Sequence, residues 1–469
     1  MPAAPAIDVS TLINERPIGR LQWRVVLFGF LIVALDGFDT AIMGFIAPEL
    51  SRVWGIAPSS LGPVLCAALA GLALGALLAG PLADRVGRKT VLVASVFLFG
   101  LWTLVAAWSP DLTTLLVLRF LTGLGLGASM PNVGTLVSEY APEKRRSILI
   151  TVVFCGFTFG AAMGGFCSAW LIPAYGWHSV LLVGGILPVL LAPVLLFKLP
   201  ESLRFLAAKG GDQMRMRAIV AQLVPGMAGS AGTFTLPQAT GPANQAGKPA
   251  SAIGIVLSRR YVFGSAMLWV TYFMGLFLVY LLGGWLPTLV KGVGFNVRDA
   301  ALITALFQIG GAVGSLCIGW AMDRLNPHRV LALAFLLGGA ATFLFGIAAK
   351  EFIELSLCAF AGGFLLNGAN TGMNALATGY YPTAARATGS SWMHGIGRWG
   401  AISSAFAGAQ MLGAGWSFAQ VFSALAIPAL IAAAAVFAKG GWTRGADGTQ
   451  PAAPGHRAPG GAAVQGARA

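Results

Sequence analysis

Long runs of apolar residues recur along the whole chain of 469 residues. A helix needs roughly 20 apolar residues to cross the hydrocarbon core of a bilayer, and about twelve such runs occur, separated by short polar breaks. Hydrophobic residues make up 57% of the chain and charged residues only 10%, which is typical of membrane proteins. We therefore predict an all-α membrane protein with about twelve transmembrane helices. The spans are expected to begin near Arg24, Leu61, Thr90, Leu112, Ser147, His178, Tyr261, Asp299, Val330, Ile353, Gly389 and Ser417.

One long polar stretch interrupts this pattern between the sixth and seventh spans. Residues 199–258 are rich in Gly, Ala, Pro, Gln and Ser, which indicates a linker between two bundles of six helices each. The predicted organisation is an N-terminal tail (1–23), a first bundle (24–198), the linker (199–258), a second bundle (259–438) and a disordered C-terminal tail (439–469).

The net charge of +14 is distributed unevenly. Lysine and arginine gather in both tails, in the linker and in the breaks "DRVGRK", "PEKRRS" and "DRLNPHR", whereas the opposite connections hold only Arg52, Lys291, Arg298 and Lys350. This asymmetry predicts a multi-pass protein with both termini and the linker in the cytoplasm, and we expect the membrane to be a bacterial inner membrane, as the family resemblance given below implies. The asymmetry explains the basic charge without a nucleic-acid partner. Five cysteines without a CxxC pair and four scattered histidines predict no disulfide, metal or cofactor.

Two polar breaks recur in each half of the chain. "GPLADRVGRK" follows the second span and "GWAMDRLNPHR" follows the eighth, so that Asp84 corresponds to Asp323. "YAPEKRR" follows the fourth span and "YYPTAAR" follows the tenth. The halves are therefore related by a parallel duplication, an architecture of transporters whose substrate site lies between the halves.

The paired "GPLADRVGRK" motif, the plan of six plus six helices and "PESLRFL" after the sixth span resemble the major facilitator superfamily. "DGFD", "LRFLTGLGLGASMPN", "SEYAPEKRRS" and "RATGSSWMHGIGRWGA" resemble its aromatic acid:proton symporter family. The resemblance implies proton-coupled uptake of aromatic carboxylates, such as 4-hydroxybenzoate or protocatechuate, by alternating access in a functional monomer. It implies a transporter rather than an enzyme.

Other functions stay open on sequence grounds. The chain could carry another benzoate-type acid (benzoate, vanillate or a hydroxyphenylpropionate), or it could be a proton-coupled exporter. A channel, a membrane enzyme and a receptor for aromatic compounds are weaker alternatives, because gating motifs are duplicated and no catalytic set stands at usable spacing.

Two acids stand in the middle of the first predicted span. A charged side chain costs about 3 kcal/mol or more at the centre of a bilayer, so Asp36 and Asp39 are expected to have a function. They lie about 60° apart around a helix, where each negative charge disfavours ionisation of the other. We predict that they couple transport to protons. The sequence leaves open which of them carries the proton.

Polar side chains in the tenth and eleventh spans are candidate substrate contacts. A guanidinium matches a carboxylate in bidentate geometry, so Arg398 is the leading candidate to bind the acid group of the substrate, and a buried ion pair with Asp36 or Asp39 is the alternative. His394 lies one helical turn before it and is either a substrate contact or a hydrogen-bonding wall. In the pattern that the resemblance supplies, its place is commonly apolar. Three amides on one helix face could bind a phenolic hydroxyl or link helices; they are Asn367, Asn370 and Asn374.

Aromatic side chains of the seventh span could stack on a benzene ring. Trp269 and Tyr272 share a face there and are candidate contacts, although packing against lipid or neighbouring helices is the alternative. Gln308 in the eighth span is a similar candidate.

Charged residues at the cytoplasmic breaks are candidate gating residues, because the motifs that hold them recur in both halves. They are Asp84, Arg85, Arg88, Lys89, Asp323, Arg324 and Arg386, and Glu139 at the end of the fourth span is a candidate partner of the first-half cluster. Ordinary solvated loop charges are the alternative. Arg119 in the fourth span needs an acid, a carbonyl or water within reach, and it matches the fourth-helix arginine of the superfamily, which implies a coupling or gating role. Gly123 and Gly127 follow it at intervals of four and predict close helix packing.

Overall fold

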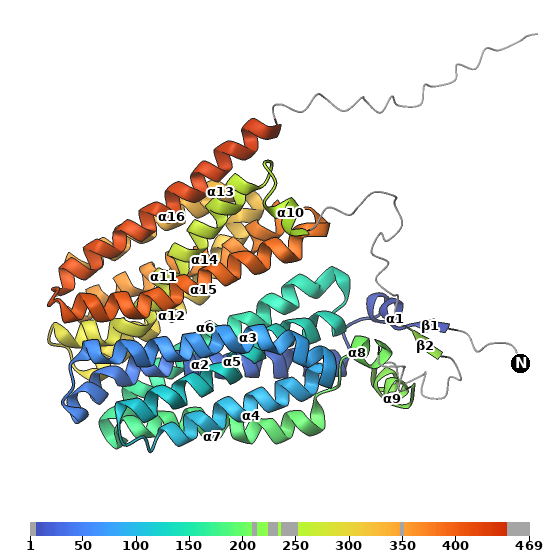
Figure 1. The fold of residues 1–469 in the computed structure, drawn as a ribbon, viewed down its shortest axis with the longest axis horizontal. Coiled ribbons are helices and arrows are strands. Elements are labelled where there is room, and N and C mark those ends of the chain that lie inside the picture. The colour runs from blue at the N-terminus through green and yellow to red at the C-terminus, as the bar shows by residue number, and fades with distance from the viewer. Residues whose placement is uncertain (1–5, 209–212, 224–232, 236–251, 348–350, 448–469) are drawn as a thin grey trace, which may run out of the picture.

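A computed structural model describes residues 6–208, 213–223, 233–235, 252–347 and 351–447 of the chain. Long helices form two bundles in this part of the chain (Figure 1). The first bundle consists of α2 (Arg20–Trp54), α3 (Gly62–Val86), α4 (Arg88–Ala106), α5 (Leu112–Tyr140), α6 (Arg146–Tyr175) and α7 (Trp177–Lys198). The second consists of α11 (Val262–Gly292), α12 (Val297–Arg324), α13 (Pro327–Ile347), α14 (Phe352–Tyr380), α15 (Thr383–Gly413) and α16 (Phe418–Asp447).

Within the described residues, eleven helices are long and apolar enough to cross a membrane. The twelfth long helix, α15, is interrupted by polar side chains, among them His394 and Arg398. It lies within the second bundle, packed along α11. The predicted twelve-helix architecture is thus confirmed, and its least apolar helix carries two of the predicted substrate contacts.

The two bundles repeat the same helix pairings. In the first bundle α2 packs on α6, α3 on α5 and α4 on α7; in the second α11 packs on α15, α12 on α14 and α13 on α16. Each helix therefore has the same neighbours as its counterpart in the other half. The tertiary structure agrees with the parallel duplication that the repeated motifs predict.

Small residues bring the paired helices close together. Gly123 and Gly127 of α5 lie directly against the backbone carbonyl oxygens of Ala68 and Leu72 in α3, where a Cβ atom would have no room. Glycines of α12 approach the backbone of α14 in the same way. The hydrophobic effect does not drive helices together within lipid, because lipid tails are as apolar as the side chains. Close van der Waals packing at such glycines therefore stabilises helix association. The predicted role of these glycines is confirmed.

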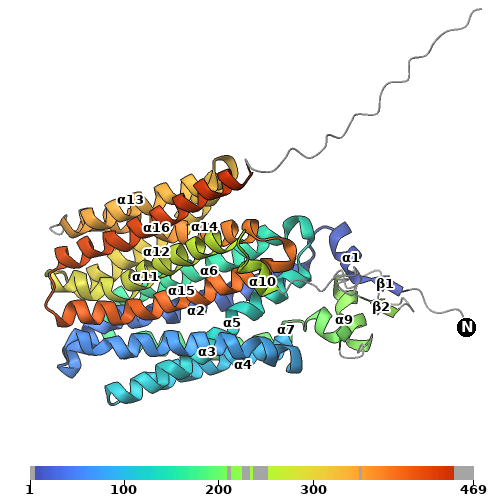
Figure 2. The ribbon, with the colours of Figure 1, turned by 45° about the horizontal axis from the view of Figure 1, so that its top comes forward.

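The bundles touch each other at one end and diverge toward the other (Figures 1 and 2). Contacts between them join α2 to α11, α6 to α12 and α3 to α15. At the joined end Gly44 of α2 faces the carbonyl oxygens of Gly283 and Gly284, at 2.6 and 2.9 Å from where its Cβ would stand. We call this the closed end, and we call the opposite end, near the segment between α7 and α11, the linker end.

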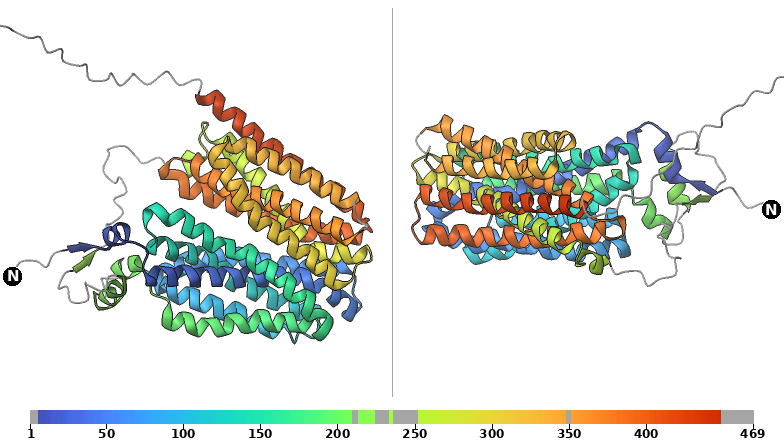
Figure 3. Two further views of the ribbon diagram at one scale, coloured as in Figure 1. Left: turned by 180° about the vertical axis from the view of Figure 1, so that it is seen from behind. Right: turned by 90° about the horizontal axis from the view of Figure 1, so that it is seen from above.

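Shorter elements gather at the linker end beside the first bundle (Figure 3). They are β1 (Ala6–Asp8), α1 (Val9–Glu15), α8 (Leu203–Ala208), α9 (Gln213–Leu223) and β2 (Thr233–Thr235), with α10 (Ala252–Val256) beside the second bundle. The strands form a two-stranded parallel sheet in which Ala6 lies opposite Thr233. The predicted tail and linker thus contain short structured segments.

The last helix extends further than the sequence predicts. The C-terminal tail was expected to begin at residue 439, but α16 continues to Asp447. Lys439 is buried, with its Nζ 3.0 Å from Nε2 of His328 and 4.0 Å from the centre of the Tyr380 ring. These contacts hold this part of the helix against α13 and α14, inside the segment expected to be a tail. The rest of the predicted tail, 448–469, lies outside the described residues.

Candidate functional site

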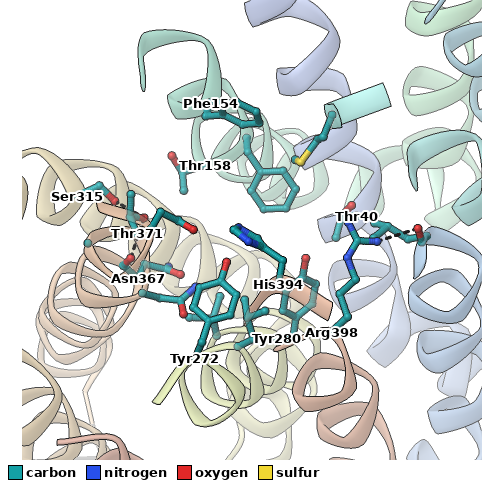
Figure 4. Close-up of a pocket in the computed structure, with 18 of the residues that line it drawn as sticks. Thr40, Phe154, Thr158, Tyr272, Tyr280, Ser315, Asn367, Thr371, His394 and Arg398 are labelled. Carbon is teal, nitrogen blue, oxygen red and sulfur yellow. Dashed lines mark hydrogen bonds between the residues drawn. The ribbon is translucent and has the colours of Figure 1, made fainter. Parts of the chain in front are cut away.

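A large cavity lies between the two bundles (Figure 4). Its volume is about 2540 Å³, which exceeds the several hundred cubic ångströms of an enclosed ligand pocket. The lining runs from Met43 and Gly283, near the closed end, to Arg260, Asp323 and His328 at the linker end. The cavity is therefore an open vestibule that reaches the linker end.

The two acids of α2 lie at the inner part of this cavity and are almost fully buried. Asp36 is 1% exposed and Asp39 is 2% exposed. Between them Gly37 packs directly on the backbone of Phe157 in α6, which draws α2 against α6 and fixes the acids in place. Asp39 lines the cavity, whereas Asp36 points toward α5.

Asp39 is paired with the buried arginine of α5. Nη1 of Arg119 lies 3.3 Å from Oδ2 of Asp39, and the Thr103 hydroxyl donates a hydrogen bond to the same carboxylate. Arg119 is fully buried, and among the described residues its Nε and Nη2 have no hydrogen-bond partner. Asp39 thus supplies the acid that Arg119 was expected to need. The Arg119 guanidinium and the Thr103 hydroxyl favour the charged form of Asp39, whereas its burial opposes that form.

Asp36 has different neighbours. The Ser129 hydroxyl lies 2.7 Å from Oδ2 of Asp36 and 2.8 Å from the carbonyl oxygen of Leu126, and the Thr40 hydroxyl is 3.5 Å from Oδ1. A hydroxyl carries one hydrogen, so Ser129 cannot donate fully to both acceptors. The short contact with Asp36 therefore fits a carboxylate that accepts from Ser129 or, when Ser129 donates to Leu126, a protonated carboxyl group that donates to Ser129.

Arg398 reaches across the cavity from the second bundle. Its Nη1 donates a hydrogen bond of 2.9 Å to the carbonyl oxygen of Leu72 in α3. The side chain is half-buried and lines the cavity. Among the described residues it forms no ion pair with Asp36 or Asp39, so the alternative of a buried pair with either acid is not realised in this conformation.

His394 lies one turn before Arg398 on the same wall. Its Nδ1 is 2.8 Å from the carbonyl oxygen of Ser390, and its ring meets the edge of Tyr272 with 5.2 Å between ring centres. Figure 4 shows the imidazole between Tyr272 and Tyr280. Aromatic and polar groups therefore meet within this part of the cavity.

The three amides of α14 line the cavity as a group. Nδ2 of Asn367 donates to Oε1 of Gln308 at 3.5 Å. The same atom packs on Gly311, where it lies 2.6 Å from the position that a Cβ atom of that glycine would take. Oδ1 of Asn370 and Oδ1 of Asn374 are buried and accept no hydrogen bond from the described residues. The structure thus brings together three polar residues of α14 and Gln308 of α12, as the helix periodicity predicts.

One predicted contact lies outside the cavity lining. Trp269 packs against Trp392 with 5.7 Å between ring centres, and only Trp392 lines the cavity. Tyr272 lines the cavity, whereas Trp269 packs on its neighbour Trp392. The structure therefore does not bring Trp269 to the cavity with the other predicted contacts.

Tyr280, another aromatic side chain of the seventh span, lies two turns after Tyr272 and lines the same cavity. Other lining residues were missed by sequence reasoning. Phe154 and Thr158 of α6 and Thr40 of α2 complete the walls seen in Figure 4. Isolated threonines and a phenylalanine in apolar helices carry no sequence signal of their own.

The predicted gating residues of the first half form a network at the linker end. Arg88 lies 3.5 Å from Asp84, 3.2 Å from Glu139 and 3.0 Å from the Ser202 hydroxyl. The Glu139 side chain is only 2% exposed, so the alternative of an ordinary solvated charge does not apply to this residue. Glu201, next to Ser202, accepts a hydrogen bond of 3.0 Å from the backbone of Lys89. The charges thus tie α3, α4 and α5 to the segment after α7.

The second half lacks an equivalent network in the part of the chain that the structure describes. Asp323 and Arg386 are exposed, and Arg324 stacks over the Trp320 ring at 4.2 Å. Asp323 faces the mouth of the cavity. Arg85, also a gating candidate, lies exposed near the end of α3. Among the described residues no group of three or more His, Cys, Asp or Glu could hold a metal ion.

Two helical bundles related by a parallel repeat, with a polar site between them, are the architecture of a secondary transporter. Comparisons with known proteins lead to the family. Residues 29–303 and 268–461 match the Major Facilitator Superfamily, and the chain therefore belongs to this superfamily. It is a multi-pass membrane transporter and not an enzyme.

The curated relatives include the 4-hydroxybenzoate transporter PcaK of Pseudomonas aeruginosa, which is 51% identical over 94% of this chain and 97% of its own length. The gallate transporter of Pseudomonas putida is 49% identical over 94% of this chain and 96% of its own length. Among solved structures, a D-xylose-proton symporter has a TM-score of 0.68 at 17% identity, covering 88% of this chain and 97% of the other. The last likeness shows the fold alone, and the relatives agree with the resemblance to aromatic acid:proton symporters.

Proposed function

We propose that this protein takes up aromatic carboxylates together with protons, with 4-hydroxybenzoate or protocatechuate as substrate. One observation carries the proposal: Arg398, the rings of Tyr272 and Tyr280, and the buried pair of Asp39 and Arg119 line the same cavity. A guanidinium suits the carboxylate, aromatic side chains suit the benzene ring, and a buried acid suits the proton. The identity to the curated relatives supports this substrate class.

Proton coupling follows from the charge of the substrate. Bringing one anion into a cell against an inside-negative potential costs about 2.3 kcal/mol per 100 mV. One accompanying proton cancels this cost, and a second makes the voltage favour entry. The acids of α2 are the proposed carriers, because they lie buried beside the cavity.

Asp36 and Asp39 divide this task in our proposal. Protonation of Asp39 weakens its attraction to Arg119 and leaves the cation for the incoming carboxylate, while Arg398 holds the same anion from the other bundle. Asp36, beside Ser129, keeps a proton when Asp39 has none. The two bundles then rock about the substrate, and the linker-end network around Arg88 opens and re-forms as the gate.

Placement in the cell is part of the proposal. The basic breaks lie at the linker end, so the positive-inside rule puts that end, with both termini, in the cytoplasm of a bacterial inner membrane. The cavity of this conformation then faces the cytoplasm. Because the cavity lies within one chain, a monomer suffices for transport. We keep the domain boundaries expected from the sequence as part of the proposal, with the first bundle beginning at Arg20 and the second extending through α16 to Asp447.

Uptake by membrane vesicles tests the function. We expect labelled 4-hydroxybenzoate and protocatechuate to accumulate only when a proton gradient, acid outside, is imposed, and to accumulate more than benzoate and vanillate. Substrate addition should alkalinise the medium. A stronger response to benzoate or vanillate would identify another benzoate-type acid as substrate. Acidification of the medium with substrate efflux would identify an exporter, and absence of accumulation for every aromatic acid would contradict the proposal.

The closed end offers a test of alternating access. Nζ of Lys291 in α11 lies 3.0 Å from the carbonyl oxygen of Pro48 and 4.0 Å from Oε2 of Glu49, both in α2. This contact joins the bundles and must break when the closed end opens. We expect Lys291→Met to favour the opposite conformation and to slow labelling of Cys155, which lines the cavity, by a water-soluble maleimide. Surface ion pairs contribute about 1 kcal/mol or less, so the slowing should be roughly two- to fivefold.

This test uses purified protein in which the other four cysteines are replaced by Ser. Arg52→Gln is the matched control, because Arg52 pairs with Glu49 within α2, at 2.5 Å, and does not join the bundles. It should leave the labelling rate unchanged. Equal rates for Lys291→Met and the unmodified chain would show that this contact does not stabilise the conformation described.

A further inference from the structure

The hydrogen bonds of His394 define which of its ring nitrogens faces a ligand. Nδ1 lies 2.8 Å from the carbonyl oxygen of Ser390, one turn earlier in α15. A carbonyl oxygen can only accept, so in the neutral imidazole Nδ1 carries the hydrogen and Nε2 is an acceptor. The described residues supply no hydrogen bond to Nε2. The side chain lines the cavity (Figure 4).

Other acceptors stand on the same side of the cavity. Oδ1 of Asn370 and Oδ1 of Asn374 are buried and accept no hydrogen bond from the described residues. Oδ1 of Asn370 lies against Gly275 of α11, and the Asn374 side chain is hydrogen-bonded with Tyr272. Nε2 of His394 is therefore an acceptor of this wall that is open to a ligand.

The spacing along α15 relates this wall to the carboxylate end of the substrate. Arg398 follows His394 by four residues on one helix face, and both side chains line the cavity. A carboxylate bound by Arg398 therefore places the rest of the ligand in the cavity that His394 also lines. Tyr272 meets the imidazole edge-on, with 5.2 Å between ring centres, and Tyr280 lines the same cavity (Figure 4), so aromatic surface for a benzene ring lies beside His394.

We propose that His394 determines specificity: its Nε2 accepts a hydrogen bond from a ring hydroxyl opposite the carboxylate, so the site selects benzoates with a free O–H donor. This inference rests on the proposed function and assigns to the His394 imidazole the recognition of the ring substituent opposite the carboxylate. A methoxy group at the same position has no hydrogen to donate. An unsubstituted ring leaves Nε2 unpaired. Both are expected to bind more weakly than the hydroxylated acid.

Two substitutions separate the acceptor from the shape of the residue. His394→Phe keeps a ring and removes the acceptor, whereas His394→Gln keeps an acceptor oxygen at a similar reach. One net hydrogen bond corresponds to roughly a three- to tenfold change in affinity. We expect the preference for 4-hydroxybenzoate over benzoate to fall by this factor in His394→Phe and to persist in His394→Gln. Thermal unfolding of each purified variant reports folding independently of transport.

The readout is the ratio of the two acids' apparent affinities in the vesicle assay. An unchanged ratio in a His394→Phe variant that still transports benzoate would overturn the inference. A second measurement needs no variant: purified unmodified protein should bind 4-hydroxybenzoate more tightly than 4-methoxybenzoate, and equal competition by the two would also overturn it. If the unmodified protein binds aromatic acids with this preference but does not accumulate them, the proposed function fails and the inference holds.

Discussion

Replacing Asp39 with Asn is expected to abolish concentrative uptake of aromatic acid and to destabilise the protein. The substitution removes the counter-charge that lies 3.3 Å from Nη1 of fully buried Arg119. Removing one partner of a buried ion pair costs about 3–5 kcal/mol, because the other charge stays buried alone. The Asn side chain also resembles a permanently protonated acid, so it cannot release a proton. Accumulation under a proton gradient and thermal unfolding of the purified protein measure the two effects.

A double substitution distinguishes stability from coupling. In Asp39→Asn combined with Arg119→Gln neither charge remains, and replacing both partners of a buried pair by neutral groups is often nearly neutral for stability. We expect the double variant to recover most of the lost thermal stability and to remain unable to accumulate substrate. Normal accumulation by Asp39→Asn would remove this acid from the coupling mechanism.

Replacing Asp36 with Asn is expected to abolish concentrative uptake as completely, yet with little loss of stability. Asp36 has hydroxyl neighbours, Ser129 at 2.7 Å and Thr40 at 3.5 Å, and no ion pair among the described residues. An Asn amide can donate to Ser129 as a protonated carboxyl does, so unfolding should shift by less than about 1 kcal/mol. Without an exchangeable proton, substrate should still equilibrate across the membrane, as measured by exchange of labelled for unlabelled substrate.

Asp111→Asn is the matched acid-to-amide control. Asp111 accepts a hydrogen bond of 2.8 Å from the backbone of Thr114 at the exposed start of α5, and Asn is an equally good residue at the start of a helix. Uptake should be unaffected. If Asp36→Asn destabilised the protein as much as Asp39→Asn, Asp36 would be a charged group in the folded protein, and the proposed division between the two acids would be wrong.

Much of the candidate site follows from helix periodicity. The i, i+3, i+7 spacing of Asn367, Asn370 and Asn374 predicts one shared face, and all three line the cavity. Trp269 shows the limit of the same reasoning. A period of 3.6 residues gives the angle between two side chains and not the direction of the cavity, so a ring at the edge of the face can pack on Trp392 instead.

Partners of charged groups could not be predicted in the same way. The sequence indicated that Arg119 needs an acid and that Arg398 could pair with Asp36 or Asp39. It did not determine which arginine pairs with which acid. Because α2 packs beside α5, Asp39 forms its ion pair with Arg119. Arg398 donates a hydrogen bond to the carbonyl oxygen of Leu72 and pairs with neither acid. Such pairings depend on distances of a few ångströms between distant segments.

The sequence by itself determined the membrane class, the duplicated bundle and the helices that carry the functional groups, because hydrophobic length and repeated motifs are properties of the chain taken in order. The tertiary structure alone decided which acid is ion-paired, which nitrogen of His394 faces the cavity, and at which end the cavity opens. These features arise where helices from both halves meet. Their energies depend on burial and hydrogen-bond geometry, which no local pattern of residues encodes.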